Sequence, residues 1–174
     1  MTLVLVWDAS PLVHAHKADR LDVLGDIVRG PASSPWSNVT TAAVVEELRT
    51  YGGEPPAWLD VVHVDGIGEL TALGTWLSRV SSATHSKGEA TVLAWAECHE
   101  AIAVVDDASA RAVGQAYGLP VHGTLWVLAQ AVRDGRLAPS AAAGLVDQLL
   151  LSGARYPCTL GKFVDWARSN GLLP

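Results

Sequence analysis

The sequence has few cysteines, few basic residues and no long hydrophobic run. Its 174 residues include two cysteines, Cys98 and Cys158, far apart and without a second cysteine or a histidine at metal-ligand spacing. A disulfide framework and a structural zinc site are therefore not indicated. With 12 Lys and Arg against 18 Asp and Glu, the net charge is −6. This charge argues against a broad basic face that binds nucleic acid non-specifically. It does not exclude a nuclease, because divalent cations can neutralise a local cluster of carboxylates.

Membrane and export signals are missing too. No hydrophobic run reaches the roughly 18 residues that a membrane span needs, and residues 1–7 have no basic region before them and are too short for a signal peptide. We therefore expect a soluble, cytoplasmic protein. Hydrophobic residues make up 49% of the chain and charged residues 17%, which fits a buried parallel sheet covered by helices. At this length we expect one domain, residues 1–174, in which residues 136–174 form a C-terminal helical extension.

Short hydrophobic runs alternate with segments of helical periodicity. The first run, residues 3–7, ends at Asp8, and Pro11 then suits the opening of a helix. A similar run, residues 101–105, ends at Asp106 and Asp107. Further strands are predicted near 38–39 and at 59–64 and 119–123, and helices at 11–28 (in two pieces around 17–19), 41–48, 66–80, 86–96, 108–117, 124–134, 140–151 and 160–170. This alternation predicts an α/β fold, a three-layer sandwich with a mainly parallel central sheet flanked by helices.

Acidic residues stand at the ends of two predicted strands and near the starts of two predicted helices. They are Asp8, Glu46, Glu47, Glu89, Asp106 and Asp107. Because parallel strands deliver their last side chains to one edge of the sheet, these carboxylates are expected to converge there. Such a cluster repels itself unless a cation binds, and oxygen ligands without His or Cys favour Mg²⁺ or Mn²⁺ over zinc. An ion of this kind can activate a water and stabilise charge on a phosphate.

Each acid also has a structural alternative. Glu89 stands three residues after Ser86, the form of a helix capping box. Asp107 can cap the helix that follows it, and the two adjacent glutamates would ordinarily be solvated on a helix surface. Asp8 and Asp106 are harder to explain in this way, because an acid that closes a buried strand needs a partner.

In their order and spacing, these segments resemble the PIN-domain family, small α/β nucleases that include the VapC-type toxins of toxin–antitoxin pairs. The matching segments are Asp8-Ala9-Ser10-Pro11 after its strand, Val44-Val45-Glu46-Glu47-Leu48, Gly88-Glu89-Ala90-Thr91-Val92-Leu93-Ala94, Val104-Val105-Asp106-Asp107-Ala108-Ser109-Ala110-Arg111 and Gly123-Thr124-Leu125-Trp126-Val127-Leu128. The resemblance spans about residues 1–136.

The resemblance implies a Mg²⁺- or Mn²⁺-dependent endoribonuclease, the toxin of a toxin–antitoxin pair. The implied catalytic residues are Asp8, Glu47, Glu89, Asp106 and Asp107, and the implied metal ligands among them are Asp8, Glu89 and Asp106. They would hold the metal and activate water. The partners it implies are an RNA substrate, an antitoxin that covers the acidic cleft and a second copy of the chain, with no membrane.

Two choices between neighbouring acids stay open. Glu47 is favoured over Glu46 because it immediately precedes the leucine in the family pattern. A shift of one residue along the helix would favour Glu46 instead. The choice between Asp106 and Asp107 is similarly open. The chain also departs from the family at Glu89, where many PIN toxins have an aspartate.

Three further residues are expected near the substrate. Ser10 can bond a metal-bound water or a phosphate, or cap its helix. Lys87 and Arg111 flank the acids and can contact RNA phosphates, or form ordinary surface ion pairs. His14 and His16 lie nearly opposite each other on a helix, the wrong spacing for a shared metal. The alternative functions are a non-catalytic PIN scaffold that binds RNA or protein and, less favoured, a metal-dependent phosphatase.

Overall fold

The computed structural model describes residues 2–80 and 87–174 and contains a five-stranded parallel sheet. The strands are β1 (Val4–Trp7), β2 (Ser37–Thr41), β3 (Asp60–Val62), β4 (Ile102–Val104) and β5 (Val121–His122). Their order across the sheet is β3-β2-β1-β4-β5, so β1 lies at the centre between β2 and β4. The predicted α/β class is confirmed, and the 59–64 segment forms an edge strand as expected.

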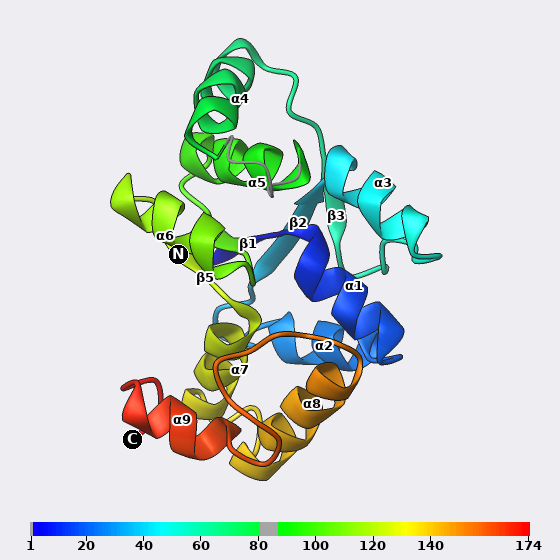
Figure 1. The fold of residues 1–174 in the computed structure, drawn as a ribbon, viewed down its shortest axis with the longest axis vertical. Helices are drawn as coiled ribbons and strands as arrows, with labels where there is room; N and C mark the ends of the chain where they lie inside the picture. Colours follow the sequence, from blue (N-terminus) through cyan, green and yellow to red (C-terminus); the bar gives the residue numbers. More distant parts are fainter. Residues whose placement is uncertain (1, 81–86) are drawn as a thin grey trace.

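Helices cover both faces of this sheet (Figure 1). They are α1 (Ala9–Lys17), α2 (Leu21–Val28), α3 (Ala42–Thr50), α4 (Ile67–Arg79), α5 (Lys87–Cys98), α6 (Ala108–Ala116), α7 (Thr124–Arg133), α8 (Pro139–Leu151) and α9 (Phe163–Ser169). Helix α5 packs against β1, β2 and β4, and α4 packs on α5. On the opposite face α2 contacts α7, followed outward by α8 and α9. The result is the predicted three-layer arrangement.

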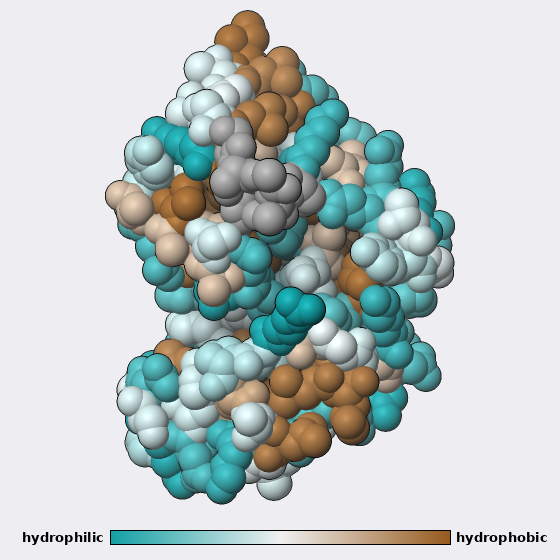
Figure 2. Space-filling model, in the orientation of Figure 1, coloured by the Kyte–Doolittle hydropathy of each residue, from teal (hydrophilic) through white to brown (hydrophobic). Residues whose placement is uncertain are grey.

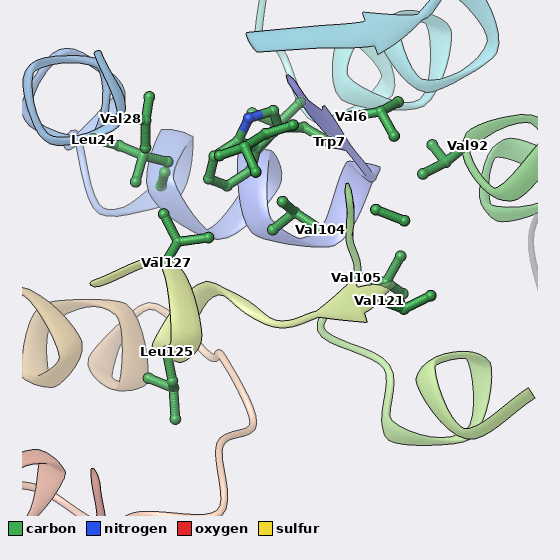
Figure 3. Close-up of a cluster of buried hydrophobic side chains, with 14 of the residues drawn as sticks. Val6, Trp7, Leu24, Val28, Val92, Val104, Val105, Val121, Leu125 and Val127 are labelled. Atoms are coloured by element: carbon green, nitrogen blue, oxygen red, sulfur yellow. The ribbon is translucent and has the colours of Figure 1, made fainter. Parts of the chain in front are cut away.

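The side chains of β1 point alternately to the two faces of the sheet and pack against the helices on both. Successive side chains of a strand point to opposite faces, and Figure 3 shows Val6 pointing toward Val92 of α5 while Trp7 points toward Leu24 and Val28 of α2. All five side chains are fully or almost fully buried. The C-terminal helices share this core, since residues of α8 and α9 belong to the same buried cluster.

Element boundaries lie close to those predicted from the sequence. The first helix begins at Ala9 rather than Pro11, and the predicted break near 17–19 separates α1 from α2, where Asp19 has a φ of 55°. Thr41 caps α3 by accepting from the N–H of Val44. The predicted capping box of Ser86 lies outside the described residues. Within the described ranges, no helix is long and apolar enough to span a membrane.

A buried hydrogen-bond chain ties the end of β1 to its neighbours. Trp7 Nε1 donates to Asn38 Oδ1 of β2 (3.0 Å), and Asn38 Nδ2 donates to the carbonyl of Val28 in α2 (2.9 Å). Trp7 and Asn38 are both buried, and the Trp7 ring also meets Trp58 edge to face with ring centroids 5.9 Å apart. These hydrogen bonds therefore fix the position of Trp7, the residue before Asp8.

Asn38→Leu is expected to lower the free energy of unfolding by about 2–4 kcal/mol, because it leaves the Trp7 N–H and the Val28 carbonyl buried without partners. Urea unfolding followed by circular dichroism measures the change. The comparison is Asn170→Leu at an exposed asparagine, whose bond to the carbonyl of Trp166 can be replaced by water, with a change of less than about 1 kcal/mol. Equal effects of the two variants would contradict the structural role of Asn38.

Candidate functional site

Four carboxylates from different elements lie near the carboxyl edge of the sheet, close enough for their charges to act on one another. Asp8 follows the central strand β1, and Asp106 follows its neighbour β4. The backbone N–H of Asp8 donates to the carbonyl of Val104 (3.0 Å), so the β1–β4 pairing continues up to Asp8. Glu89 is buried in the first turn of α5, and Glu47 is half-buried on α3. The charges of Glu89, Glu47 and Asp106 all act on the carboxyl group of Asp8.

Asp8 is the most deeply buried member of this cluster. Its side chain is 2% exposed, and Oδ1 is buried without a hydrogen-bond partner among the described residues. The pKa of Asp8 is raised well above its ordinary value, first by burial and then by the charges of Glu89, Glu47 and Asp106, against a bond from the backbone of Ala9. A buried carboxylate with an unpartnered oxygen is costly, and a cation would remove that cost.

Local packing at the start of α5 places Glu47. The backbone N–H of Gly88 donates to Glu47 Oε1 (3.1 Å), and a Cβ at position 88 would collide with that oxygen. Thr91 Oγ1 donates to the carbonyl of Gly88 (2.6 Å) and bonds the hydroxyl of Thr41, the cap of α3 (2.7 Å). The starts of α3 and α5 are thereby linked. Glu46, by contrast, lies on the exposed face of α3.

The two adjacent aspartates after β4 have different environments. Asp106 accepts from Thr124 through both oxygens, from the backbone N–H (2.7 Å) and from Oγ1 (2.9 Å), and Tyr156 donates to it at 3.4 Å. Burial raises the pKa of Asp106, while the bonds from Thr124 oppose that rise. Asp107 is exposed and caps α6 by accepting from the N–H of Ala110 (2.8 Å). The structure thus brings Asp106, not Asp107, to Asp8.

The predicted substrate residues lie around this cluster. Lys87 is exposed at the first residue of α5, and Ser10 is half-buried in the first turn of α1. Arg111 is half-buried, and its Nη1 donates to the carbonyls of Val105 (3.0 Å) and Asp106 (2.6 Å). Arg111 therefore supports the loop that carries Asp106.

Three residues beside Asp106 were not predicted from the sequence. His14 is half-buried, and its Nδ1 has no hydrogen-bond partner within the described part of the chain. Its pKa is lowered by burial, although the charge of Asp106 acts in the other direction. Thr124 lies in the Gly123–Leu128 segment, whose resemblance to the family could have indicated it as a site residue. Tyr156 has no such signal, because long-range packing alone brings it to Asp106.

The donor set fits a hard divalent cation on two grounds. Asp8 Oδ1 has no hydrogen-bond partner among the described residues, and the neighbouring carboxylates offer oxygen ligands, which Mg²⁺ and Mn²⁺ prefer. In residues 2–80 and 87–174, no three Asp, Glu, His or Cys side chains already stand close enough to bind one ion together. Joint binding of one ion by three of these carboxylates would therefore require them to move closer to one another, whereas one or two carboxylates with waters are also a common arrangement for Mg²⁺.

Asp8→Asn is expected to stabilise the metal-free protein at about pH 7, by on the order of 1–3 kcal/mol, because it removes a buried charge among like charges. The pKa of Asp8 is higher in the folded than in the unfolded protein. The folded state therefore binds the extra proton, and the wild type loses stability as the pH rises from about 4 through the raised pKa. Urea unfolding in EDTA at several pH values measures this.

Two features of this experiment make it specific. The gain should shrink toward about pH 3, below the ordinary Asp pKa of about 3.9, where the wild-type carboxyl is mostly protonated in both states. The exposed Asp22→Asn serves as the control, with a change below about 0.5 kcal/mol at every pH. If Asp8→Asn destabilises the protein equally at both ends of the range, the burial of a repelled charge is not the controlling effect.

Comparison with known families gives a match to the PIN domain over residues 4–164. The match includes every acid discussed above and extends beyond residue 136, through α8 to the start of α9. A comparison with curated proteins gives no match. Members of the matched family are in general nucleases. Since the match covers most of the chain, and the parallel sheet agrees with it, the protein belongs to the PIN-domain family.

Proposed function

We propose that the protein is a metal-dependent endoribonuclease. The observation that carries the proposal is the Asp8 carboxylate, which is buried at the end of the central strand. One of its oxygens has no partner among the described residues, and three like charges act on it. Such a group is unfavourable in the metal-free protein and useful when a cation binds. Carboxylate-held Mg²⁺ or Mn²⁺ is a common solution for hydrolysis of phosphodiesters.

Asp8, Glu89 and Asp106 are the proposed metal ligands, and we assign this role to Asp106 because Asp107 caps α6. When bound, the ion would polarise the phosphate and lower the pKa of a water. The chain itself orients the ligands: Thr124 holds both oxygens of Asp106. Glu47, fixed by the Gly88 N–H, is the proposed acceptor for the proton of the attacking water.

RNA phosphates are the proposed partners of Ser10, Lys87 and Arg111. Lys87 is exposed beside the first turn that carries Glu89. Nε and Nη2 of Arg111 make no hydrogen bond to any described residue, so they remain available to a phosphate although Nη1 is bonded to the chain.

We further propose that the protein is the toxin of a toxin–antitoxin pair and acts in the cytoplasm as a homodimer. An exposed apolar face supports a protein partner: on α4, Ile67 is 87% exposed and Leu70 50%. Figure 2 shows hydrophobic residues gathered over α4, at the top of the molecule. An antitoxin would in addition cover the acidic edge, where an arginine could pair with the carboxylates.

One observation favours the non-catalytic scaffold as a second candidate. Among the described residues the carboxylates are not yet close enough for three of them to share an ion. In that case the site would bind RNA or protein without turnover.

The proposed function predicts Mg²⁺- or Mn²⁺-dependent cleavage of a mixed RNA pool by the purified protein, lost in EDTA. Asp8→Asn should reduce the rate about 100-fold or more, since a bound metal contributes several kcal/mol of transition-state stabilisation. Gel analysis of the RNA measures the rate, and Asp22→Asn is the matched control. Full activity of Asp8→Asn, or activity in EDTA, would refute the metal mechanism. Folded protein without any cleavage would favour the scaffold, and hydrolysis of phosphomonoesters alone would favour the phosphatase.

Gly88→Ala is expected to reduce cleavage about 10-fold or more, because the new Cβ displaces Glu47, and loss of such a supporting contact commonly has this effect. Gly74→Ala is the matched control, since no described atom lies within 4 Å of a Cβ built there. The same RNA assay compares the two variants. Equal rates would show that the position of Glu47 does not matter to the reaction.

A further inference from the structure

A cleft lies beside the carboxylates, and most of its wall takes no part in the proposed chemistry. Its volume is about 600 Å³, within the usual range for small-molecule sites. It opens between the first turns of α6 and α7 and the C-terminal segment. Asp106 is part of its wall. The cleft is therefore continuous with the proposed metal ligands.

Aromatic rings form part of the wall. His122 and Trp126 both line the cleft, and their rings are stacked with centroids 4.1 Å apart and planes 8° from parallel. Trp166 of α9 lines the same space. Flat aromatic surfaces of this kind are the platforms on which proteins stack the bases of single-stranded nucleic acid.

Side-chain amides supply acceptors at the same place. Asn170 Nδ2 donates to the carbonyl of Trp166 (2.8 Å), and Gln115 Nε2 donates to the carbonyl of Val121 (2.9 Å). Both side chains line the cleft. With their nitrogens held by the backbone, the amide oxygens can accept from a base N–H group.

Two arginines offset the charges of Asp106 and Asp107 in the cleft wall, although the chain as a whole carries −6. Arg111 and Arg155 line the cleft, and Arg155 is exposed and forms no ion pair or hydrogen bond with a described residue. A guanidinium group suits a phosphate, to which it can donate two parallel hydrogen bonds. Aromatic, amide and guanidinium groups together match the parts of a nucleotide.

We propose that this cleft binds a nucleobase of a single-stranded RNA, on the nucleotide next to the bond that is cleaved. The base stacks on the Trp126 ring, on the face opposite His122, and Arg155 contacts a neighbouring phosphate. The proposal rests on the proposed function for its RNA ligand, but base binding itself requires neither metal nor cleavage. A free nucleotide has the same chemistry, so the test must separate the two sources.

Binding in EDTA tests the site without cleavage. The probes are a short labelled single-stranded oligoribonucleotide of mixed sequence and the same strand with abasic sites, measured by fluorescence anisotropy. The wild type should bind the normal strand about 10-fold more tightly than the abasic one. Trp126→Ala should abolish this difference, and Asn170→Ala should reduce it. Arg155→Ala should weaken both strands alike.

Controls and contrary results follow from the same titrations. Tyr51→Ala and Arg29→Ala, at exposed residues away from the cleft, should bind as the wild type does. Circular dichroism establishes that each variant is folded, and Asn170→Ala tests the site even if Trp126→Ala does not fold. Equal binding of the normal and abasic strands by the wild type, or unchanged discrimination by folded Trp126→Ala or Asn170→Ala, would overturn the proposal.

Two further comparisons separate the remaining possibilities. A nucleoside monophosphate should compete with the oligonucleotide only at much higher concentration, and competition at equal concentration would overturn the assignment to an RNA strand. Base-dependent binding without any metal-dependent cleavage would overturn the proposed function but not the base site. Cleavage without base-dependent binding would overturn the base site alone.

Discussion

The buried carboxylate of Asp8 is the constraint on which the rest of the structure depends. It follows the central strand, one oxygen has no partner among the described residues, and burial and then like charges raise its pKa. Stability alone does not favour such an arrangement, and sites of this kind are a common place where proteins exchange stability for function. The bonded pair Trp7 and Asn38 fixes the backbone immediately before it. The packed core thereby keeps the Asp8 carboxylate buried, away from solvent.

Two glycines position the other carboxylates by leaving room for them. At Gly88 the missing side chain admits Glu47 to a backbone N–H of α5. At Gly123 an added Cβ would lie 3.1 Å from Asp106 Oδ1, which accepts from the N–H of Thr124. In both cases a backbone donor at the start of a helix orients an acid, and such N–H groups attract negative charge. The geometry of the site thus depends on backbone as much as on side chains.

The sequence predicts the sheet and the gathering of the acids because both follow from short-range patterns: a buried strand that ends in an acid, followed by a helix. The sequence does not decide between neighbours such as Glu46 and Glu47 as the residue that faces the site. Both lie on the same turn of a helix, and packing determines which one points inward. For Asp106 and Asp107 the deciding contacts are a helix cap and a bond to Thr124. Tyr156 reaches the site through the packing of the C-terminal segment, which no local pattern encodes.

That C-terminal segment bears on how an acidic protein would bind RNA, as proposed above. A net charge of −6 provides no broad attraction for a phosphate backbone, so affinity must come from local contacts. Arg155 and Trp166 belong to the segment and line the cleft next to Asp106, and Tyr156 bonds Asp106 directly. Stacking depends far less on net charge than phosphate binding does, because every base presents a π-face. In the proposed complex, a cleft of this composition would supply binding where the electrostatic field does not, and it would place that binding beside the carboxylates.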